Sequence, residues 1–282
     1  MEIRSRSNIK IKQLRAAFAG QERLSEGLLG IEGEHLLEEA VRSGLEIRTV
    51  FLTQHQQIPS QLGTRTEIVR VSTDVFRSAV ETRSPQGIAA LVRRPSSNIA
   101  EIFERQENAL IVVAAGLQDP GNLGTIIRSA EAFGASGVIA TPGTVSAWNP
   151  KAVRASVGSV FRLPVATASN NEIAELASEH GVRLFAAVGS GGNGVLRAQE
   201  ARLGEPSAFL IGNEGAGISQ ELMELGPESI TIPCPGPVES LNAAVAASLL
   251  LYEASRQRSL DTRKVVSRIP GPLRRRPTGA TR

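Results

Sequence analysis

The sequence has little cysteine, few aromatic residues and no long apolar run. Its one cysteine, Cys234, cannot form a disulfide within the chain, and the first residues lack the apolar stretch of a secretory signal, so a cytoplasmic protein is predicted. Aromatic residues make up 4% of the 282 residues, which disfavours binding by stacking nucleic-acid bases on many rings. No apolar stretch is long enough to cross a bilayer, so no membrane span is predicted.

Motifs of several common enzyme classes are also missing. The three histidines, His35, His55 and His180, are scattered and lack the spacing of metal ligands, so no metal site is predicted. There is no phosphate-binding P-loop and no nucleophilic serine elbow with the partners of a triad. The glycine cluster at 189–194 has no GxGxxG register and no following helix, so we interpret it as a loop.

Positive charge is concentrated at the two ends of the chain. Five basic residues and one acidic residue in 1–20 give +4, and nine basic residues and one acidic residue in 256–282 give +8. The total of +3 therefore leaves −9 for residues 21–255. Basic ends on an acidic body are typical of nucleic-acid contacts, and a solvated tail without a partner is the open alternative.

Residue patterning divides the chain into five segments. Residues 1–20 are predicted to form a basic amphipathic lead helix, and residues 21–95 a small α/β domain. A polar, proline-containing stretch then predicts a linker over 96–108. Residues 109–255 form the largest predicted domain, and residues 256–282, with three prolines, are predicted to be a disordered basic tail.

The largest segment alternates strand and helix signals. A buried-strand run at Leu110–Ala115 is followed by a helical pattern, and the same succession recurs up to a closing helix at 240–255. This alternation predicts a mostly parallel sheet with helices on both faces. Open α/β sheets place ligands at the carboxyl ends of their strands, and three polar motifs stand at such positions. We expect the three motifs to share one pocket.

The first motif, residues 122–134, begins where a strand should turn into a helix. Asn122 is the predicted N-cap of that helix, and Arg128 projects from the side opposite its apolar face. A plain cap at Asn122 and a surface ion pair between Arg128 and Glu131 would explain the same residues.

The second motif, residues 210–217, begins at the end of a predicted strand. Three glycines in the loop 212–217 allow the backbone to approach a ligand closely, and Glu214 is the one charged residue there. A plain glycine-rich turn has the same composition, so this motif is weak evidence when it is taken alone.

The third motif, residues 232–242, is a stiff proline-rich loop that leads into an apolar helix. Ser240 is the predicted N-cap, and Asn242, in the first turn, needs hydrogen-bond partners if it is buried. A helix that is apolar all round must be buried on more than one side. One side is predicted to face the sheet and the other a second subunit, while a simple core helix is the alternative.

Taken in order, the three motifs and the segment 149–158 resemble the SpoU (TrmH-type) branch of the SPOUT RNA methyltransferases. The resemblance covers roughly residues 109–255. Residues 21–95 are similar to the small substrate-binding domain that often accompanies it and that resembles kink-turn-binding ribosomal proteins. The sequences Glu32-Gly-Glu-His35 and Ser84-Pro-Gln-Gly87 carry this second resemblance.

The resemblance implies an RNA 2′-O-methyltransferase with a C-terminal trefoil knot, a homodimer and S-adenosylmethionine as methyl donor. The acceptor is a ribose 2′-hydroxyl, in ribosomal RNA rather than transfer RNA, because minimal transfer-RNA members usually lack the small domain. The implied active-site residues are Asn122, Arg128, Glu214 and Asn242. The implied cofactor-binding residues are Ile211, Gly212, Asn213, Ile232 and Leu241. A transfer-RNA 2′-O-methyltransferase and a catalytically silent RNA-binding or ribosome-assembly factor are the alternatives.

Two details modify what the resemblance implies. The family places Arg128 as a general base, but a guanidinium stays protonated in proteins. We therefore expect Arg128, held by Asn122 and Glu214, to orient the hydroxyl and to stabilise developing negative charge. Ala243-Ala244 stands where the family often has Val-Ser, so any role of that serine hydroxyl is lost here.

Overall fold

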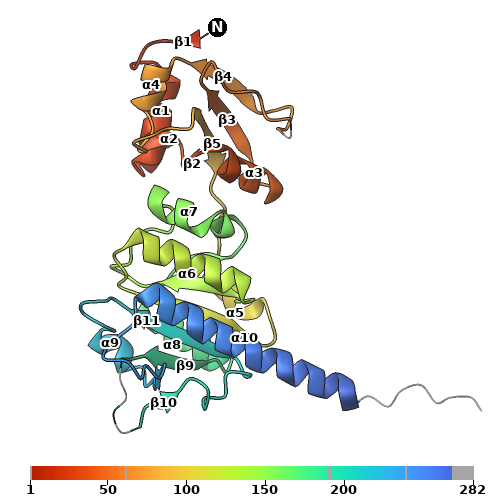
Figure 1. Cartoon of the computed structure of the whole chain (residues 1–282), viewed down its shortest axis with the longest axis vertical. Helices are drawn as coiled ribbons and strands as arrows, with labels where there is room; N and C mark the ends of the chain where they lie inside the picture. The colour runs from red at the N-terminus through yellow and green to blue at the C-terminus, as the bar shows by residue number, and fades with distance from the viewer. Residues whose placement is uncertain (1, 61, 190–191, 193, 239, 269–282) are drawn as a thin grey trace, which may run out of the picture.

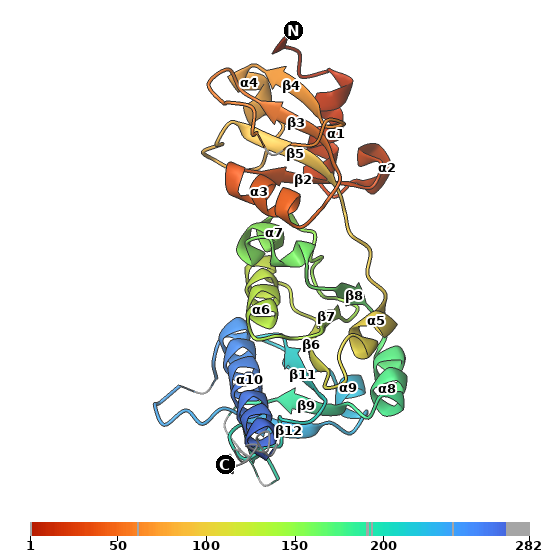
Figure 2. The same ribbon diagram turned by 90° about the vertical axis from the view of Figure 1, so that its right-hand side faces the viewer.

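The structure is a computed structural model that describes residues 2–60, 62–189, 192, 194–238 and 240–268, with side chains up to residue 260. Two sheets lie one above the other along the long axis (Figures 1 and 2). The smaller sheet belongs to the N-terminal part of the chain, and the larger one to the rest. No helix in the described ranges combines the length and the apolar character that crossing a membrane requires.

The smaller sheet has five strands in the order β1-β4-β3-β5-β2. β5 is antiparallel to both of its neighbours, whereas β3 and β1 run parallel to β4. The strands are β1 (Glu2–Ile3), β2 (Leu28–Glu32), β3 (Ile47–Leu52), β4 (Glu67–Val71) and β5 (Ile88–Arg93). The accompanying helices are α1 (Ile9–Phe18), α2 (Glu22–Ser25), α3 (Glu34–Arg42) and α4 (Thr73–Arg77).

The predicted lead helix is part of this small domain. Helix α1 is capped by Asn8, whose side chain accepts a hydrogen bond from the backbone of Lys10. Leu14 is fully buried in the same apolar cluster as Phe51 of the sheet. Ile9, the first residue of the helix, is 75% exposed.

The larger sheet has seven strands in the order β10-β12-β9-β11-β6-β7-β8, and every described pairing in it is parallel. The strands are β6 (Leu110–Ala115), β7 (Gly137–Ala140), β8 (Val165–Thr167), β9 (Arg183–Ala187), β10 (Leu196–Arg197), β11 (Ser207–Gly212) and β12 (Glu228–Thr231). The helices are α5 (Ile99–Glu104), α6 (Pro120–Ala132), α7 (Pro150–Ser156), α8 (Asn170–Glu179), α9 (Gln220–Met223) and α10 (Ala243–Arg268), with a 3-10 turn, η1 (Ser159–Phe161).

Separate apolar clusters cover the two faces of this sheet. One contains Ile126 of α6 and Leu250 of α10, and the other contains Ile102 of α5 and Ile173 of α8. The predicted mostly parallel sheet with helices on both faces is therefore confirmed.

The predicted linker at 96–108 contains a helix in its middle part. Helix α5 forms there, and Asn98 caps it by accepting a hydrogen bond from the backbone nitrogen of Ala100 at 3.1 Å. Ile102 and Phe103 are buried against the large sheet. Ile99, Ile102 and Phe103 have the spacing of a helix face, a signal that the polar residues before them obscured.

The predicted disordered tail is wrong for its first half. Helix α10 continues through residue 255 to Arg268, and residues 269–282 lie outside the described residues. The Arg258 guanidinium is partly buried and donates hydrogen bonds to backbone carbonyls of the large domain, those of Leu203, Asn108, Ala109 and Glu205. Burial lowers the pKa of Arg258 to about 10, so it stays protonated at neutral pH. Because arginine and glutamine are good helix formers, nothing in the sequence stops the helix at 255.

Candidate active site

Helix α6 begins one turn earlier than predicted. Asp119 is its N-cap and accepts hydrogen bonds from the backbone nitrogens of Gly121 and Asn122, while Pro120 occupies the first helical position. The hydrogen bond from the Asn122 backbone, followed by that from Lys151, holds the pKa of Asp119 below its ordinary value. Because Asp119 is the cap, the Asn122 side chain is free for other contacts.

Asn122 joins the three motifs. Its amide nitrogen donates to the Glu214 carboxylate, and its amide oxygen accepts a hydrogen bond from Nδ2 of Asn242 at 3.1 Å. The Asn242 oxygen in turn accepts from the backbone nitrogens of Ala244 and Val245, at 3.0 and 3.2 Å. Asn242, and not Ser240 as predicted, thus caps α10. We call Glu214, Asn122 and Asn242 the polar chain.

The second motif folds back on itself. Asn213 and Gly217 exchange backbone hydrogen bonds of 3.0 and 2.9 Å, and the Asn213 side chain donates to the Gly116 carbonyl at 3.2 Å. A Cβ atom on Gly212 would lie 2.5 Å from the carbonyl carbon of Gly217. The close approach of these two backbone segments therefore requires glycine at 212.

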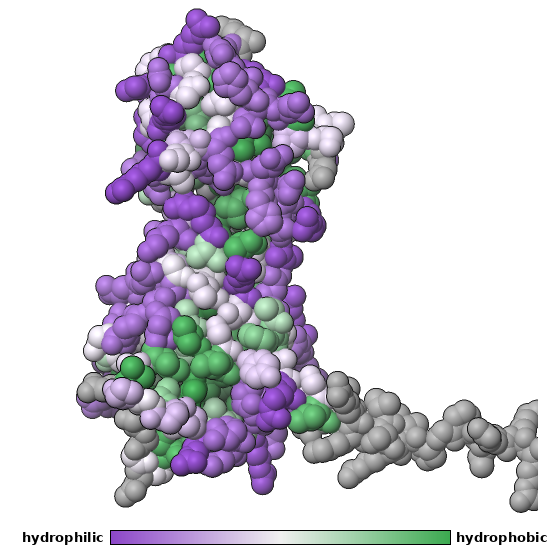
Figure 3. Space-filling model, viewed as in Figure 1, coloured by the Kyte–Doolittle hydropathy of each residue, from purple (hydrophilic) through white to green (hydrophobic). Residues whose placement is uncertain are grey.

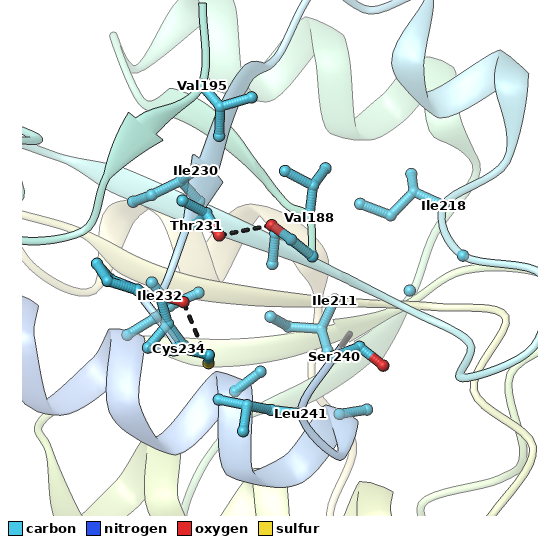
Figure 4. A pocket seen from close by; sticks show the side chains of 18 of the residues that line it. Val188, Val195, Ile211, Ile218, Ile230, Thr231, Ile232, Cys234, Ser240 and Leu241 are labelled. Carbon is cyan, nitrogen blue, oxygen red and sulfur yellow. Dashed lines mark hydrogen bonds between the residues drawn. The ribbon is translucent and has the colours of Figure 1, made fainter. Parts of the chain in front are cut away.

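A cavity of about 1030 Å³ opens beside this loop. Its lining includes all five predicted cofactor-binding residues: Ile211, Gly212, Asn213, Ile232 and Leu241. Figure 4 shows the side chains of Ile211, Ile232 and Leu241 around one space, with Ile230 and Val188 nearby. Sequence reasoning missed Val188 and Ile230, although both lie at or just past the carboxyl ends of strands, where such residues are expected.

The polar chain lies at one end of this cavity and is open to solvent. Glu214 lines the cavity, and Asn242 is exposed but still has the hydrogen-bond partners that burial would require. The structure therefore brings Asn122, Glu214 and Asn242 together next to the predicted cofactor residues.

Arg128 stands apart from this arrangement. Its side chain is exposed on α6, and within the described ranges it forms no hydrogen bond or ion pair with Asn122 or Glu214. Glu131 pairs with Arg162, at 2.6 Å, so the alternative ion pair with Arg128 is also not formed. The expected hold of Asn122 and Glu214 on Arg128 is thus not formed, and the side chain of Arg128 lies on the surface of α6.

Helix α10 has one apolar face against the sheet and another that is exposed. Leu250, Leu251 and Ala254 are fully buried. Val245, Leu249 and Tyr252, spaced by four and three residues, are 48%, 42% and 52% exposed. In Figure 3, apolar surface gathers in the region of α9 and the start of α10. The predicted second apolar side of the helix is present; we call these three residues the α10 stripe.

Both domains of the chain match known protein families. Residues 109–252 match the SpoU rRNA Methylase family, and residues 8–90 match the MRM3-like substrate binding domain. The chain therefore belongs to the SpoU rRNA methylase family.

Individual relatives extend over nearly the whole chain. The 23S rRNA (guanosine(2553)-2′-O)-methyltransferase RlmP of Bacillus subtilis is 34% identical over 251 residues, which cover 89% of this chain and 98% of that protein. The 23S rRNA (uridine(2479)-2′-O)-methyltransferase of Streptomyces viridochromogenes is 32% identical, over 89% of this chain and 91% of that protein. The crystal structure of the SpoU methyltransferase AviRb from the same organism, in complex with AdoMet, has a TM-score of 0.78 and 28% identity. The structural match covers 89% of this chain and 98% of the AviRb chain.

Proposed function

We propose that this protein transfers a methyl group from S-adenosylmethionine to a ribose 2′-hydroxyl of ribosomal RNA. The observation that carries the proposal is the cavity at the strand ends, with the polar chain at its edge. The named activities of the relatives from Bacillus subtilis and Streptomyces viridochromogenes support ribosomal RNA as the substrate. The cytoplasmic location stays a prediction.

The lining of the cavity fits S-adenosylmethionine. An adenosine moiety needs apolar side chains on its faces and backbone groups at its edge, and the cavity offers Ile211, Ile232 and Leu241 beside the backbone of the loop 212–217. When bound, the cofactor supplies an electrophilic methyl group on a sulfonium. Ile211, Gly212, Asn213, Ile232 and Leu241 would hold it.

The residues of this chain would act mainly by positioning the weakly nucleophilic hydroxyl. Near-attack geometry can lower a barrier by about 7–11 kcal/mol. In this proposal Arg128 orients the ribose or an adjacent phosphate and stabilises the negative charge that develops on the attacking oxygen. The polar chain fixes the starts of α6 and α10, and with them the edge of the cavity. In the free protein, one oxygen of the Glu214 carboxylate accepts a hydrogen bond from Asn122, and in this proposal the other oxygen accepts one from a bound ribose.

The proposal includes a homodimer and the trefoil knot that the family resemblance implies. The α10 stripe is an exposed apolar surface next to the cavity, and a second copy of the chain is the occupant we assign to it. A twofold contact there would also bury the exposed Asn242.

The experiment that tests the activity is methyl transfer from tritiated S-adenosylmethionine to ribosomal RNA purified from cells lacking this gene. We expect label in 2′-O-methyl dinucleotides that resist nuclease. If label appeared only in transfer RNA, the proposed substrate would change from ribosomal RNA to transfer RNA. No label in any RNA, together with retained RNA binding, would favour the silent assembly factor.

A further inference from the structure

The N-terminal domain rests directly on the methyltransferase domain. The Arg162 guanidinium, just after η1, donates through Nη1 to Oε2 of Glu39 on α3 at 2.6 Å and to the Ser43 hydroxyl at 3.1 Å. Its Nε and Nη2 atoms donate to the carboxylate of Glu131 on α6, at 2.6 and 3.0 Å. One guanidinium thus bridges both domains; we call Glu39, Ser43, Glu131 and Arg162 the interdomain cluster.

The backbone beneath Glu39 is shaped for this contact. Gly158 has φ of 83°, and a Cβ atom there would lie 2.7 Å from Cβ of Glu39. Val157, before it, is held in the left-handed region at φ of 51°, which is uncommon for a β-branched residue. Glu39 itself is 6% exposed. Close approach and local strain at one turn indicate a built interface and not a chance surface contact.

A second contact joins the connecting segment to the same interface. The Arg94 guanidinium lies 5.8 Å from the centre of the Trp148 ring, just before α7. Trp148 packs against an apolar cluster that holds Leu37 of α3 and Val160 of η1, one residue from each domain. The domains therefore share apolar packing as well as charge.

The interface leads to the helix that carries the candidate site. Helix α7 packs along α6 (Figure 2), and Lys151 of α7 pairs with the α6 cap Asp119 at 3.1 Å. Glu131, the anchor of Arg162, lies on α6, which also carries Asn122 and Arg128. Anything held by the N-terminal domain is thus placed relative to α6 through short, packed connections.

We infer that Arg162, through Glu39 and Glu131, is a positioning residue that fixes the N-terminal domain over α6 and so determines which nucleotide reaches the polar chain. This rests on the proposed function, with the N-terminal domain gripping a structured part of the RNA. The fixed offset between the two domains then selects the methylated position. If the N-terminal domain were free to move, it would still bind RNA, but nucleotides next to the target would also reach the polar chain.

The Arg162–Glu131 pair of the interdomain cluster is charged at neutral pH, since each partner shifts the pKa of the other toward its ionised form. Burial is the largest single influence and raises the pKa of Glu131, but the hydrogen bonds from Arg162 and Ser159 and the nearby positive charges together outweigh it, so the net pKa lies below the ordinary value. An arginine suits the position because its planar fork reaches two carboxylates at once, whereas a lysine offers one point charge.

The test compares Glu39→Gln with Arg42→Met in the full-length protein. Arg42 binds the other oxygen of the Glu39 carboxylate, at 2.6 Å, but lies on α3 itself, so its loss leaves the bridge between the domains intact. We expect Glu39→Gln to raise KM for ribosomal RNA about tenfold, because one partner of a partly buried charged pair is lost. The values of kcat and of S-adenosylmethionine affinity should stay at wild-type level. Primer-extension mapping should find methyl groups on neighbouring nucleotides, whereas Arg42→Met should resemble the wild type.

A second variant covers the case in which Glu39→Gln does not fold. Arg162→Lys keeps the charge but cannot bind both carboxylates, so we expect an intermediate KM and the same spread of methylated positions. Wild-type KM with a single methylated position in either folded variant, or a lower kcat at unchanged KM, overturns the inference.

The emission of Trp148, the single tryptophan, separates this inference from the proposed function. If the domains loosen in Glu39→Gln, acrylamide should quench Trp148 more strongly than in the wild type or in Arg42→Met. If the wild type methylates no RNA, the proposed function fails, while unchanged quenching in Glu39→Gln would independently refute the fixed interface.

Discussion

At the scale of single residues, Asn122 is the link among the three motifs. Its side chain uses both polar atoms, one toward Glu214 and one toward Asn242. The sequence marked Asn122 as a helix cap, a role that Asp119 fills. An asparagine that is released from capping and engaged twice by other motifs is better explained by the site than by helix stability.

We predict that Asn122→Ala lowers kcat for methyl transfer by about 10²-fold, as expected when one preorganised polar group is removed from a site. The affinity for S-adenosylmethionine, measured by calorimetry, should change little, because Asn122 does not line the cavity. Thr125→Ala is the matched control, since Thr125 is exposed on the same helix and bonds only to the Gly121 carbonyl among the described residues. Equal losses in both variants would assign the effect to helix α6 as a whole.

Arg128→Ala should abolish methyl transfer while leaving S-adenosylmethionine affinity nearly unchanged. Its side chain is exposed and lies outside the cavity lining, so it can act on the RNA but not hold the cofactor. Arg128→Lys should recover only part of the rate, because a lysine cannot form paired hydrogen bonds. A large loss of cofactor affinity would contradict this assignment.

At the scale of elements, helix α10 combines three tasks along its length. Its first turn is capped by Asn242 at the candidate site, and its middle packs on the sheet. Near residue 258, the hydrogen bond from Arg258 to the Asn108 carbonyl holds the helix at the amino end of β6. The α10 stripe is the side that these contacts leave uncovered.

Leu249→Glu should convert the proposed dimer into a monomer in sedimentation equilibrium, because a charge would be buried in an apolar contact. The fold should survive, since Leu249 is 42% exposed on the single chain. Leu260→Glu is the matched control, because Leu260 is 44% exposed on the same helix, about two turns beyond the end of the stripe. A monomeric wild type would remove the second subunit from the proposal.

Helix α6 should lose stability in acid through its cap. The pKa of Asp119 is lowered by the backbone hydrogen bond from Asn122 and by Lys151, so the folded state favours the ionised carboxylate. This contribution is complete above the ordinary value of 3.8 and is lost as the pH falls through the lowered value. Asp119→Asn keeps the cap acceptor but has no charge to titrate. Its free energy of unfolding, measured in urea, should therefore fall less than that of the wild type between neutral pH and acid.

At the scale of the whole molecule, the two domains lie one above the other along the long axis, and the end of α10 projects to one side (Figure 1). The N-terminal domain meets the methyltransferase domain through the interdomain cluster, and α10 projects at the other end. An extended RNA could contact both domains at once, which accords with the match of residues 8–90 to a substrate-binding domain.

Removal of residues 269–282 should weaken RNA binding and reduce its dependence on salt, because this segment carries four arginines. The deletion has to start at 269, since an earlier cut shortens α10 and one before 258 also removes the Arg258 contacts. Binding to ribosomal RNA across a salt titration is the measurement. An unchanged salt slope would favour the solvated tail without a partner.

The sequence alone predicted the parallel sheet, the strand-end position of the three motifs and their polar residues. Those features depend on local periodicity and on short motifs, which are readable within a few residues. It misplaced the caps at Asn122 and Ser240 because several adjacent polar residues can cap a helix, and only the packing of the helix selects one. It ended α10 too early although the residues after 255 are good helix formers, and the contacts of Arg258, which hold this part of the helix, are made with residues distant in sequence.

Only the tertiary structure decided how the distant residues combine. Glu214 and Asn122 are 92 positions apart, and Arg162 and Glu39 are 123 positions apart, so no local pattern could pair them. The parallel strands bring their carboxyl ends to one edge, and this arrangement places the three motifs at a single cavity. The turn at 157–158 likewise receives Glu39 of α3 and so decides where the N-terminal domain docks on the methyltransferase domain, which composition and charge leave open.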